Sequence, residues 1–222
     1  MKLKKNIKIA IDSPAAAGAG TQAKLISKHY NLFYLDTGKI YRALAYDKLK
    51  NKKKFNTSFI KKKMKKLKMK DLGSKKLSSN EVGTVASIIA KDKKIRKLVH
   101  KFQKRCAYFP GKKYSGSCLD GRDITYKITP DAEFKFFITA NIKTRAIRRY
   151  KELKKFNKNI NFSDVLKSIK KRDKNDYKRK ISPLKKTKDS ILINTTNLTK
   201  RACFLKIKKI IDKKLKKYEK NL

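Results

Sequence analysis

Five short apolar runs, rich in β-branched or aromatic residues and bounded by turn residues, recur along the chain. They cover residues 6–12, 32–35, 117–120, 134–139 and 190–194. Runs of this length and composition are typical of strands buried inside a sheet. Between them, apolar residues recur three or four positions apart, which is the helical period. The pattern therefore predicts an α/β fold: a largely parallel five-stranded sheet with helices on both faces.

The predicted helices fill the intervals between these strands. One helix is expected to begin after Thr37 as its N-cap, and the spacing of apolar residues in the lysine-rich segment 49–79 predicts a surface helix. The remaining helices are predicted at residues 21–30, 79–89, 92–107, 142–155, 162–172 and 204–218.

The charge of the chain is far from balanced. Its 222 residues include 64 Lys and Arg against 17 Asp and Glu, for a net charge of +47. Phe, Ile, Leu and Val make up about a quarter of the residues, above the roughly 20% below which a highly charged chain stays disordered. A folded protein is therefore predicted, and no apolar run reaches the roughly 18 residues of a membrane span. Residues 1–6 lack the apolar stretch of a signal peptide, so a cytoplasmic protein is expected.

Cysteine and histidine residues are few and scattered. Cys106, Cys118 and Cys203 form no close pair, and His29 and His100 are the only histidines. Neither a disulfide framework nor a zinc site is predicted from such spacing. The cysteines are expected to be buried thiols, and the histidines to have no catalytic role.

The positive charge has two possible origins. The chain has 54 lysines and 10 arginines, and it is rich in Asn and Ile. Residues encoded by A+T-rich codons dominate this composition, so a coding bias explains the charge without a nucleic-acid partner. The alternative is binding to the phosphates of a nucleic acid or of a small nucleotide.

The turn after the first predicted strand has the composition of a phosphate-binding loop. Residues 13–21 read Ser-Pro-Ala-Ala-Ala-Gly-Ala-Gly-Thr and lead into a predicted helix. Small residues let backbone N–H groups close around an anion, and the helix N-terminus behind the loop favours negative charge. The lysine that usually precedes the Ser or Thr of such loops is absent. The loop by itself is also compatible with a packing turn of small residues.

Five motifs together resemble those of bacterial cytidylate kinase, a nucleoside monophosphate kinase family. The loop is similar to that family's Gly-Pro-x-x-x-Gly-Lys-Gly-Thr, and residues 34–42 to its Tyr-Leu-Asp-(Ser/Thr)-Gly-x-x-Tyr-Arg. The order and spacing of the motifs agree over residues 6–212. The other three matches are residues 85–87 with Arg96, residues 119–123 with 130–132, and residues 172–179.

The resemblance implies in-line transfer of the γ-phosphoryl group of ATP to CMP or dCMP, with Mg²⁺ on the donor phosphates. It implies that ATP binds the loop formed by Ser13, Pro14, Ala15, Ala16, Ala17, Gly18, Ala19, Gly20 and Thr21, with Thr21 near the Mg²⁺. It implies an acceptor site formed by Thr37, Arg42, Ser87, Arg96, Arg122, Asp123, Arg172, Asp176 and Arg179.

The roles implied for individual residues follow from the same resemblance. Arg42, Arg122 and Arg179 would hold the acceptor phosphate, and Arg148 begins the lid over the triphosphate; Arg122, Arg179 and Arg148 are the predicted catalytic residues. Ser87, Arg96 and Asp123 would read the cytosine edge. Asp176, with Arg172, would bind the ribose. Arginine, with its forked guanidinium group, suits phosphate better than lysine does.

The resemblance also implies how the chain is divided. A single domain over residues 1–222 would comprise a core of 1–36, 110–141 and 180–222. A monophosphate-binding region of about 37–109 and a lid of about 145–178 would complete it. The family resemblance implies a monomer whose partners are nucleotides.

Three positions depart from the family pattern. Ala19 replaces the loop lysine, Ser13 replaces the first glycine, and Thr125 stands where glycine is usual. The segment 49–79 is also too short for the three-stranded insert of many members. Three hypotheses stay open: a working kinase in which Lys24 or a lid arginine replaces the lysine, an impaired nucleotide-binding member, and a nucleic-acid-binding protein on the same fold.

Overall fold

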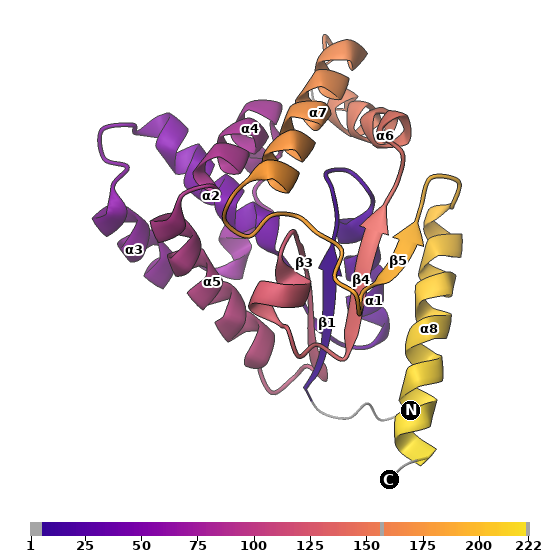
Figure 1. Cartoon of the computed structure of the whole chain (residues 1–222). Helices are drawn as coiled ribbons and strands as arrows, with labels where there is room; N and C mark the ends of the chain where they lie inside the picture. Colours follow the sequence, from indigo (N-terminus) through magenta and orange to yellow (C-terminus); the bar gives the residue numbers. More distant parts are fainter. Residues whose placement is uncertain (1–5, 156–157, 221–222) are drawn as a thin grey trace.

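A five-stranded parallel sheet forms the centre of the protein (Figure 1). The structure is a computed structural model that describes residues 6–155 and 158–220, with side chains up to residue 217. The strand order is β2-β3-β1-β4-β5, and every neighbouring pair is parallel. The strands are β1 (Ile7–Asp12), β2 (Phe33–Asp36), β3 (Gly116–Gly121), β4 (Phe134–Thr139) and β5 (Ile191–Asn194). The predicted fold class is confirmed.

Eight α-helices and three shorter helical turns connect the strands in the described part of the chain. The α-helices are α1 (Ala19–His29), α2 (Thr37–Lys50), α3 (Thr57–Lys66), α4 (Asn80–Ile89), α5 (Lys93–Tyr108), α6 (Ile142–Lys154), α7 (Phe162–Lys178) and α8 (Lys200–Lys220). The turns are η1 (Met69–Gly73), η2 (Lys75–Ser78) and η3 (Ile124–Ile128).

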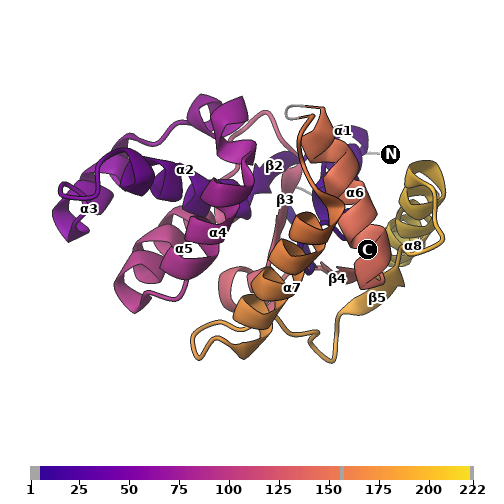
Figure 2. The same ribbon diagram turned by 90° about the horizontal axis from the view of Figure 1, so that it is seen from above.

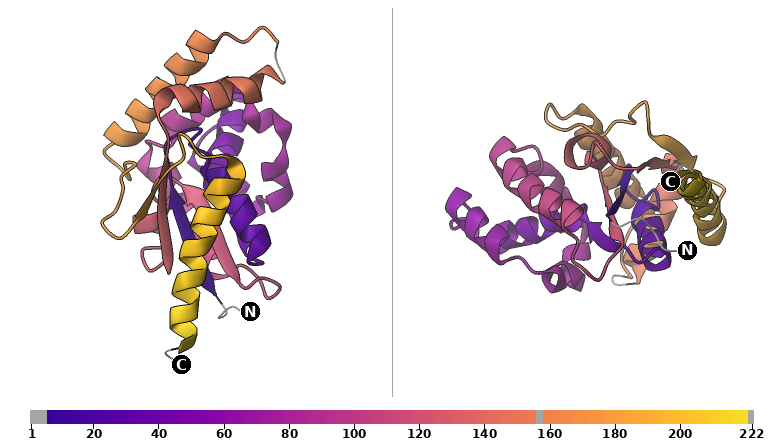
Figure 3. Two further views of the ribbon diagram at one scale, coloured as in Figure 1. Left: turned by 90° about the vertical axis from the view of Figure 1, so that its right-hand side faces the viewer. Right: turned by 90° about the horizontal axis from the view of Figure 1, so that it is seen from below.

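Alternate side chains of β1 point to two different cores. Ile9 and Ile11 pack with α1 and α8 on one face, whereas Ala10 packs with α2–α5 on the other. Successive residues of a strand point to opposite faces of the sheet, so both faces of β1 must be apolar. Figure 3 shows α8 along one side of the sheet and the group α2–α5 on the other.

Helices α6 and α7 pack together above the carboxyl ends of the strands (Figures 1 and 2). Their contact is a small separate cluster of buried residues: Ala146, Leu153, Val165 and Ile169. This cluster holds α7 between α6 and the group α2–α5. One face of α7 lies over the carboxyl end of the sheet (Figures 1 and 2). Ligands of open α/β sheets bind at this edge.

Two local predictions were wrong in detail. Asp36, not Thr37, is the N-cap of α2: an Asp36 carboxylate oxygen accepts a hydrogen bond from the Lys39 N–H. Helix α7 continues beyond Arg172 to Lys178. In the lysine-rich segment 49–79, the predicted surface helix is present as α3, with Ile60 and Met64 buried. The turns η1 and η2 follow it, and their Leu72 and Leu77 also reach the core.

The structure also bears on the expectations for the cysteines and for membrane-spanning helices. All three cysteines are free thiols; Cys118 and Cys203 are buried, and Cys106 is half-buried. In the described ranges, no helix combines the length and the apolar character needed to cross a membrane. Some predicted positions lie outside the described residues: residues 1–5 and 221–222 of the predicted core, and residues 156–157 of the predicted lid. The side chain of residue 218, the last of the predicted closing helix, is also outside the description.

Candidate active site

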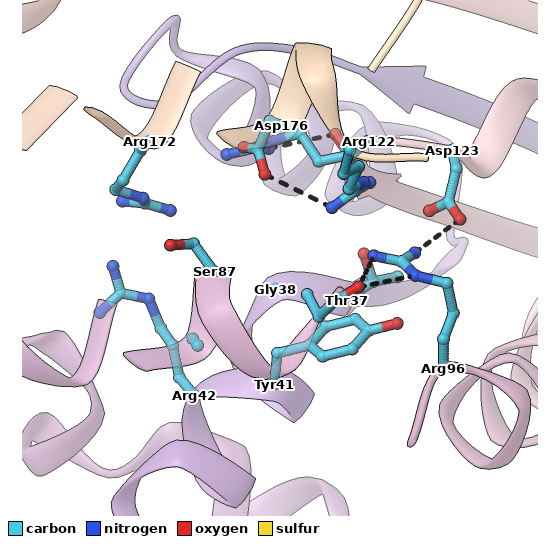
Figure 4. Close-up of a pocket in the computed structure, with 14 residues that line it drawn as sticks. Thr37, Gly38, Tyr41, Arg42, Ser87, Arg96, Arg122, Asp123, Arg172 and Asp176 are labelled. Carbon is cyan, nitrogen blue, oxygen red and sulfur yellow. Dashed lines mark hydrogen bonds and ion pairs between the residues drawn. The ribbon is translucent and has the colours of Figure 1, made fainter. Parts of the chain in front are cut away.

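A pocket lined by arginines lies at the carboxyl edge of the sheet, between α2, α4, α5 and α7 (Figure 4). Its floor is the start of α2 and the turn after β3. The lining residues are Thr37, Gly38, Tyr41, Arg42, Ala86, Ser87, Ala90, Arg96, Gly121, Arg122, Asp123, Arg172, Asp176 and Arg179. The structure thus brings all nine residues of the predicted acceptor site into one pocket.

Two aspartates neutralise only part of the positive charge of five arginines. Asp176 accepts from Arg122 Nε at 2.7 Å and from Arg179 Nη1 at 3.4 Å. Burial favours the neutral acid, but Arg122, Arg172 and Arg179 outweigh it and hold the pKa of Asp176 below its usual value. Asp176 is therefore ionised, and it orders the arginines around it.

The remaining cations repel one another. Burial, and next the charges of Arg172 and Arg149, lower the pKa of Arg42 to about 9. Burial and the nearby Arg122 lower the pKa of Arg172 to about 10. Buried cations with lowered pKa values indicate a surplus of positive charge that a bound anion would relieve.

Two buried donors of this pocket have no acceptor. Arg179 Nη2 and Arg172 Nε make no hydrogen bond with any residue that the structure describes. A buried donor without a partner is costly, and more so when it carries charge. These donors mark the place where the pocket fits an anion with several oxygens.

Arg42 reaches the pocket because two backbone segments hold it. Its Nη1 donates to the carbonyls of Leu77 at 2.7 Å and of Ser79 at 3.1 Å. On α4, a Cβ at Gly83 would lie 2.7 Å from Arg42 Nη2, so only glycine permits this approach. The turn η2 and the start of α4 therefore position the guanidinium group.

Asp123 is the second carboxylate of the pocket. Its Oδ2 accepts from Arg96 Nη1 at 2.8 Å, and Arg96 also donates through Nε and Nη2 to the carbonyl of Ala90. The Arg96 guanidinium lies 5.2 Å from the centre of the Tyr41 ring, within the range of a cation–π contact. Ser87, on the adjoining wall, donates to the Thr84 carbonyl.

The floor of the pocket depends on Thr37 and Gly121. Thr37 Oγ1 donates to the carbonyl of Asp120 at 2.7 Å. A Cβ on Gly121 would lie 2.4 Å from that hydroxyl oxygen, so glycine is required for this contact between β3 and α2.

The predicted phosphate loop, residues 13–21, joins β1 to α1. Gly18 is the N-cap of α1 with φ of 95°, and no side chain caps the helix. The first N–H groups of α1 therefore have no intrahelical acceptor and face the loop, as an anion site requires. Ser13, which replaces the first glycine of the family pattern, does not have a positive φ; within the loop, the left-handed residue that is not glycine is Ala16, with φ of 59°. Ala19 is the first residue of α1, and it is buried in the core that α1 shares with the sheet.

Asp12, immediately before the loop, ties the loop to the neighbouring strand end. Its carboxylate accepts from the N–H groups of Ile124 and Thr125 and from Thr125 Oγ1. Thr125, which departs from the glycine of the family pattern, thus supplies an additional hydrogen bond at 2.6 Å. Burial is the main cause that raises the pKa of Asp12 to about 6.

Two arginines of α6 contact the phosphate loop. Arg148 Nη1 lies 2.9 Å from Thr195 Oγ1 and 3.5 Å from the Ala17 carbonyl. Arg145 donates to the Ala15 carbonyl at 3.1 Å and pairs with Asp173 of α7 at 2.7 Å. Arg148 therefore lies at the loop and apart from the acceptor pocket.

The first turn of α1 and the end of β3 together provide oxygen ligands suitable for Mg²⁺. The Thr21 side chain is exposed there, and a Cβ on Gly20 would lie 3.6 Å from Asp120 Oδ2. Asp120 Oδ1 is buried and has no partner among the described residues. Burial, followed by the neighbouring Asp36, raises the pKa of Asp120 above its usual value, and a cation would reverse that shift.

Sequence reasoning missed three contributors to this site. Tyr41 forms a wall of the pocket, Thr195 holds Arg148, and His100 contacts Asp123. The sequence carries a signal for His100, because it lies four residues after Arg96 and shares its helix face. The role of Thr195 depends on the pairing of β5 with β4 at the edge of the sheet, which the sequence pattern does not specify.

The chain is similar to cytidylate kinases along most of its length. A family model described as cytidylate kinase matches residues 9–214. The cytidylate kinase of Bartonella tribocorum is 42% identical over 201 residues, which span 88% of this chain and 90% of that protein. The cytidylate kinase of Clostridium botulinum strain Okra is 39% identical over 219 residues, with 94% and 99% covered.

A solved structure supports the fold independently. An uncharacterized protein from Eubacterium ventriosum superposes with a TM-score of 0.55 at 18% identity, covering 93% of this chain and 99% of its own. At that identity the likeness concerns the fold alone. The family model and the sequence relatives, which both extend over nearly the whole chain, establish that this chain belongs to the cytidylate kinase family.

Proposed function

We propose that this protein transfers the γ-phosphoryl group of ATP to CMP or dCMP, giving ADP and CDP or dCDP. Membership of the cytidylate kinase family supports the reaction. The structural observation that carries the proposal is the acceptor pocket, where five arginines face two aspartates and two buried arginine donors lack an acceptor among the residues that the structure describes. Phosphoryl transfer needs positioning and charge stabilisation rather than a covalent group from the protein.

The acceptor phosphate fits among Arg42, Arg122 and Arg179. Their guanidinium groups come from α2, from the turn after β3 and from the end of α7. Arg179 Nη2 supplies a donor that is already buried and oriented. A phosphate held from three directions is fixed for in-line attack on the donor.

The base fits between Ser87, Arg96 and Asp123. A cytosine edge presents an amine donor beside two acceptors, and it therefore asks for a carboxylate and for arginine or hydroxyl donors. Asp176 and Arg172 lie at the α7 wall, where the ribose hydroxyls would find a carboxylate acceptor.

The phosphates of ATP fit the loop of residues 13–21. The N–H groups at the start of α1 would bind them, and Arg148 would add a cation at the Ala17–Gly18 side of the loop. Thr21, with Asp120 near it, would hold Mg²⁺, which supplies charge neutralisation on the donor phosphates when bound. Arg122, Arg179 and Arg148 are the groups that would stabilise charge on the transferred phosphoryl group.

Ala19 favours a second candidate, an impaired enzyme that still binds nucleotides. The missing lysine charge would act on the phosphates most strongly in the transition state, so its loss should reduce turnover more than binding. Lys24 is the nearest replacement on α1: its side chain is exposed, and its Nζ lies 6.0 Å from the centre of the Tyr34 ring beside Asp120.

The wider assignments remain part of the proposal. They include the division of the chain into a core, a monophosphate-binding region of residues 37–109 and a lid of residues 145–178. We expect a monomer, and light scattering of the purified chain tests this expectation.

Substitution of Arg179 tests the acceptor assignment. Arg179→Ala removes charge-assisted hydrogen bonds worth about 1.5–3 kcal/mol, so CMP should bind roughly 10- to 100-fold more weakly in a folded protein. Isothermal titration with CMP measures the change, and circular dichroism checks the fold. Arg201→Ala, an exposed arginine of α8, is the matched control and should bind CMP normally. Unchanged CMP affinity in Arg179→Ala would remove Arg179 from the acceptor site.

A further inference from the structure

His100 contacts the carboxylate that faces the candidate base site. It lies on α5, one turn after Arg96, and its Nε2 is 2.9 Å from Asp123 Oδ2. Arg96 Nη1 reaches the same oxygen at 2.8 Å. The sequence pattern assigned no role to this histidine, since it has no cluster of ligands or catalytic partners near it in the chain.

Two donors therefore converge on one oxygen of Asp123. An imidazole that carries its hydrogen on Nε2 donates to Oδ2, and a protonated imidazole does so as well. Oδ1 of Asp123 accepts no hydrogen bond from any described residue, and the carboxyl group lines the pocket. Figure 4 shows the oxygen that does not pair with Arg96 turned toward the other pocket residues.

The Arg96 contact alone leaves the carboxylate free to turn. Arg96 is itself fixed by two bonds to the Ala90 carbonyl and by the Tyr41 ring, but it holds Asp123 through a single nitrogen. His100 Nε2 reaches Oδ2 from a second direction, and this second hydrogen bond restricts rotation of the Asp123 carboxylate. Burial opposes ionisation of Asp123, yet the hydrogen bond from His100 and the charge of Arg96 keep its pKa below the usual value.

We infer that His100 is a positioning residue that holds Asp123 so that Oδ1 is presented to the pocket as an acceptor only. A ligand base with an exocyclic amine at that place would be bound, and a base with a carbonyl there would meet a carboxylate and be rejected. The inference rests on the proposed function, because it assigns a base-selecting role within the same pocket. His100 itself touches no substrate and acts through Asp123.

Two substitutions separate hydrogen bonding from packing. His100→Leu preserves the approximate size of the side chain and removes the N–H donor, whereas His100→Gln keeps an N–H donor. Both residues have good helix propensity. Lys97→Ala, an exposed position between Arg96 and His100 on the same helix, is the control. If His100→Leu does not fold, His100→Ala takes its place.

The measurements are kcat and KM for CMP, with UMP as acceptor or competitive inhibitor. Loss of one hydrogen bond to the carboxylate should raise the KM for CMP by about tenfold, with kcat within about twofold and the constant for UMP nearly unchanged. The preference for CMP over UMP then falls about tenfold. His100→Gln should stay within about threefold of the unmodified chain, and Lys97→Ala should match it.

Three results would overturn the role of His100: equal effects of Leu and Gln, parallel changes in the constants for CMP and UMP, or no change in His100→Leu. Each of these leaves the proposed function intact if the unmodified chain binds CMP. Failure of the proposed function looks different, because the unmodified chain would then show neither CMP binding nor a preference for CMP over UMP.

Discussion

At the scale of single residues, the phosphate loop contains one of the four non-glycine residues with a positive φ in the described chain. Ala16 has φ of 59°, a left-handed conformation that disfavours any residue with a Cβ. The residues next to Ala16 in the loop are small, and Ser13, the first residue of the loop, does not have a positive φ. Asp12 contributes the compensating contacts, because its carboxylate accepts three hydrogen bonds from Ile124 and Thr125.

Replacement of Ala16 by glycine should stabilise the protein. Glycine adopts φ of 59° without strain, and the relief should exceed its entropic cost, giving a gain of about 0.5–1 kcal/mol. Ala15→Gly, at the adjacent position without a positive φ, should instead lower stability by about 0.5–1 kcal/mol. Urea unfolding of the two variants measures both changes. Destabilisation by Ala16→Gly would show that the loop is not strained there.

Asp12 should make the stability of the protein depend on pH. Its pKa rises from 3.8 to about 6 on folding, so folding favours the protonated acid. The stabilisation is complete below about pH 4 and is lost as the pH rises through 6, by up to about 3 kcal/mol.

Comparison with Asp12→Asn isolates this group. The asparagine variant loses the titration but keeps every other group, so the difference between the two unfolding free energies reports Asp12 alone. From pH 4 to pH 7, the free energy of unfolding of the unmodified chain should fall relative to that of the variant. A difference that stays constant with pH would contradict the raised pKa.

At the scale of elements, α7 is the part on which the acceptor pocket depends most. It carries Arg172 and Asp176 one turn apart and ends immediately before Arg179, so one helix presents three pocket residues. Its packing rests on the small cluster that it shares with α6, separate from the cores on the two faces of the sheet. The position of α7 therefore depends on few buried residues.

Ile169→Ala should loosen α7 while it leaves the sheet intact. Ile169 is 2% exposed within the α6–α7 cluster, and its truncation should cost about 2–4 kcal/mol of local stability. Hydrogen exchange should become faster in α6 and α7 and stay unchanged in β1 and β4. The KM for CMP should rise because Arg172 and Asp176 move with the helix. Lys167→Ala, exposed on α7, should change neither; equal acceleration in the strands would contradict a separate cluster.

Some elements follow from the sequence pattern, and others depend on contacts between distant residues. The strands β1, β3 and β4 are predictable because their apolar runs are buried on both faces of the sheet, as β4 illustrates. The edge strand β5 exposes Ile191 and Leu192. The last part of α7, residues 173–178, is polar and shows no apolar period; it stays helical with Asp173 paired to Arg145 and Asp176 to Arg122. The N-cap of α2 was misassigned because Asp36 and Thr37 both suit that position, and Thr37 instead bonds to β3.

The residues of the candidate site also divide into those that local motifs predict and those that depend on contacts between distant residues. The acceptor residues could be predicted because their motifs are local in sequence. The contact of His100 with Asp123 joins α5 to the turn after β3. The position of His100 four residues after Arg96 indicates a shared helix face, but it does not indicate that both side chains reach Asp123. Ala16 is left-handed and Ser13 is not, a difference that the composition of the loop does not reveal.

For the whole molecule, the placement of the charges is more informative than their sum. Five arginines line the acceptor pocket and two more reach the phosphate loop, although the chain has 54 lysines and only 10 arginines. The arginines thus gather where forked donors can bind phosphate groups. The pocket supports a nucleotide as the anionic partner, and Ala19 leaves the rate of transfer as the property most in need of measurement.

The most direct test is ADP formation from ATP and Mg²⁺ with and without CMP, for the unmodified chain and for Ala19→Lys in the same assay. The account predicts ADP formation that depends on CMP in both, with the lysine variant faster because it adds charge at the phosphates. Activity in Ala19→Lys alone would identify the unmodified chain as an impaired enzyme with an intact site. CMP-independent rates in both proteins would contradict the account.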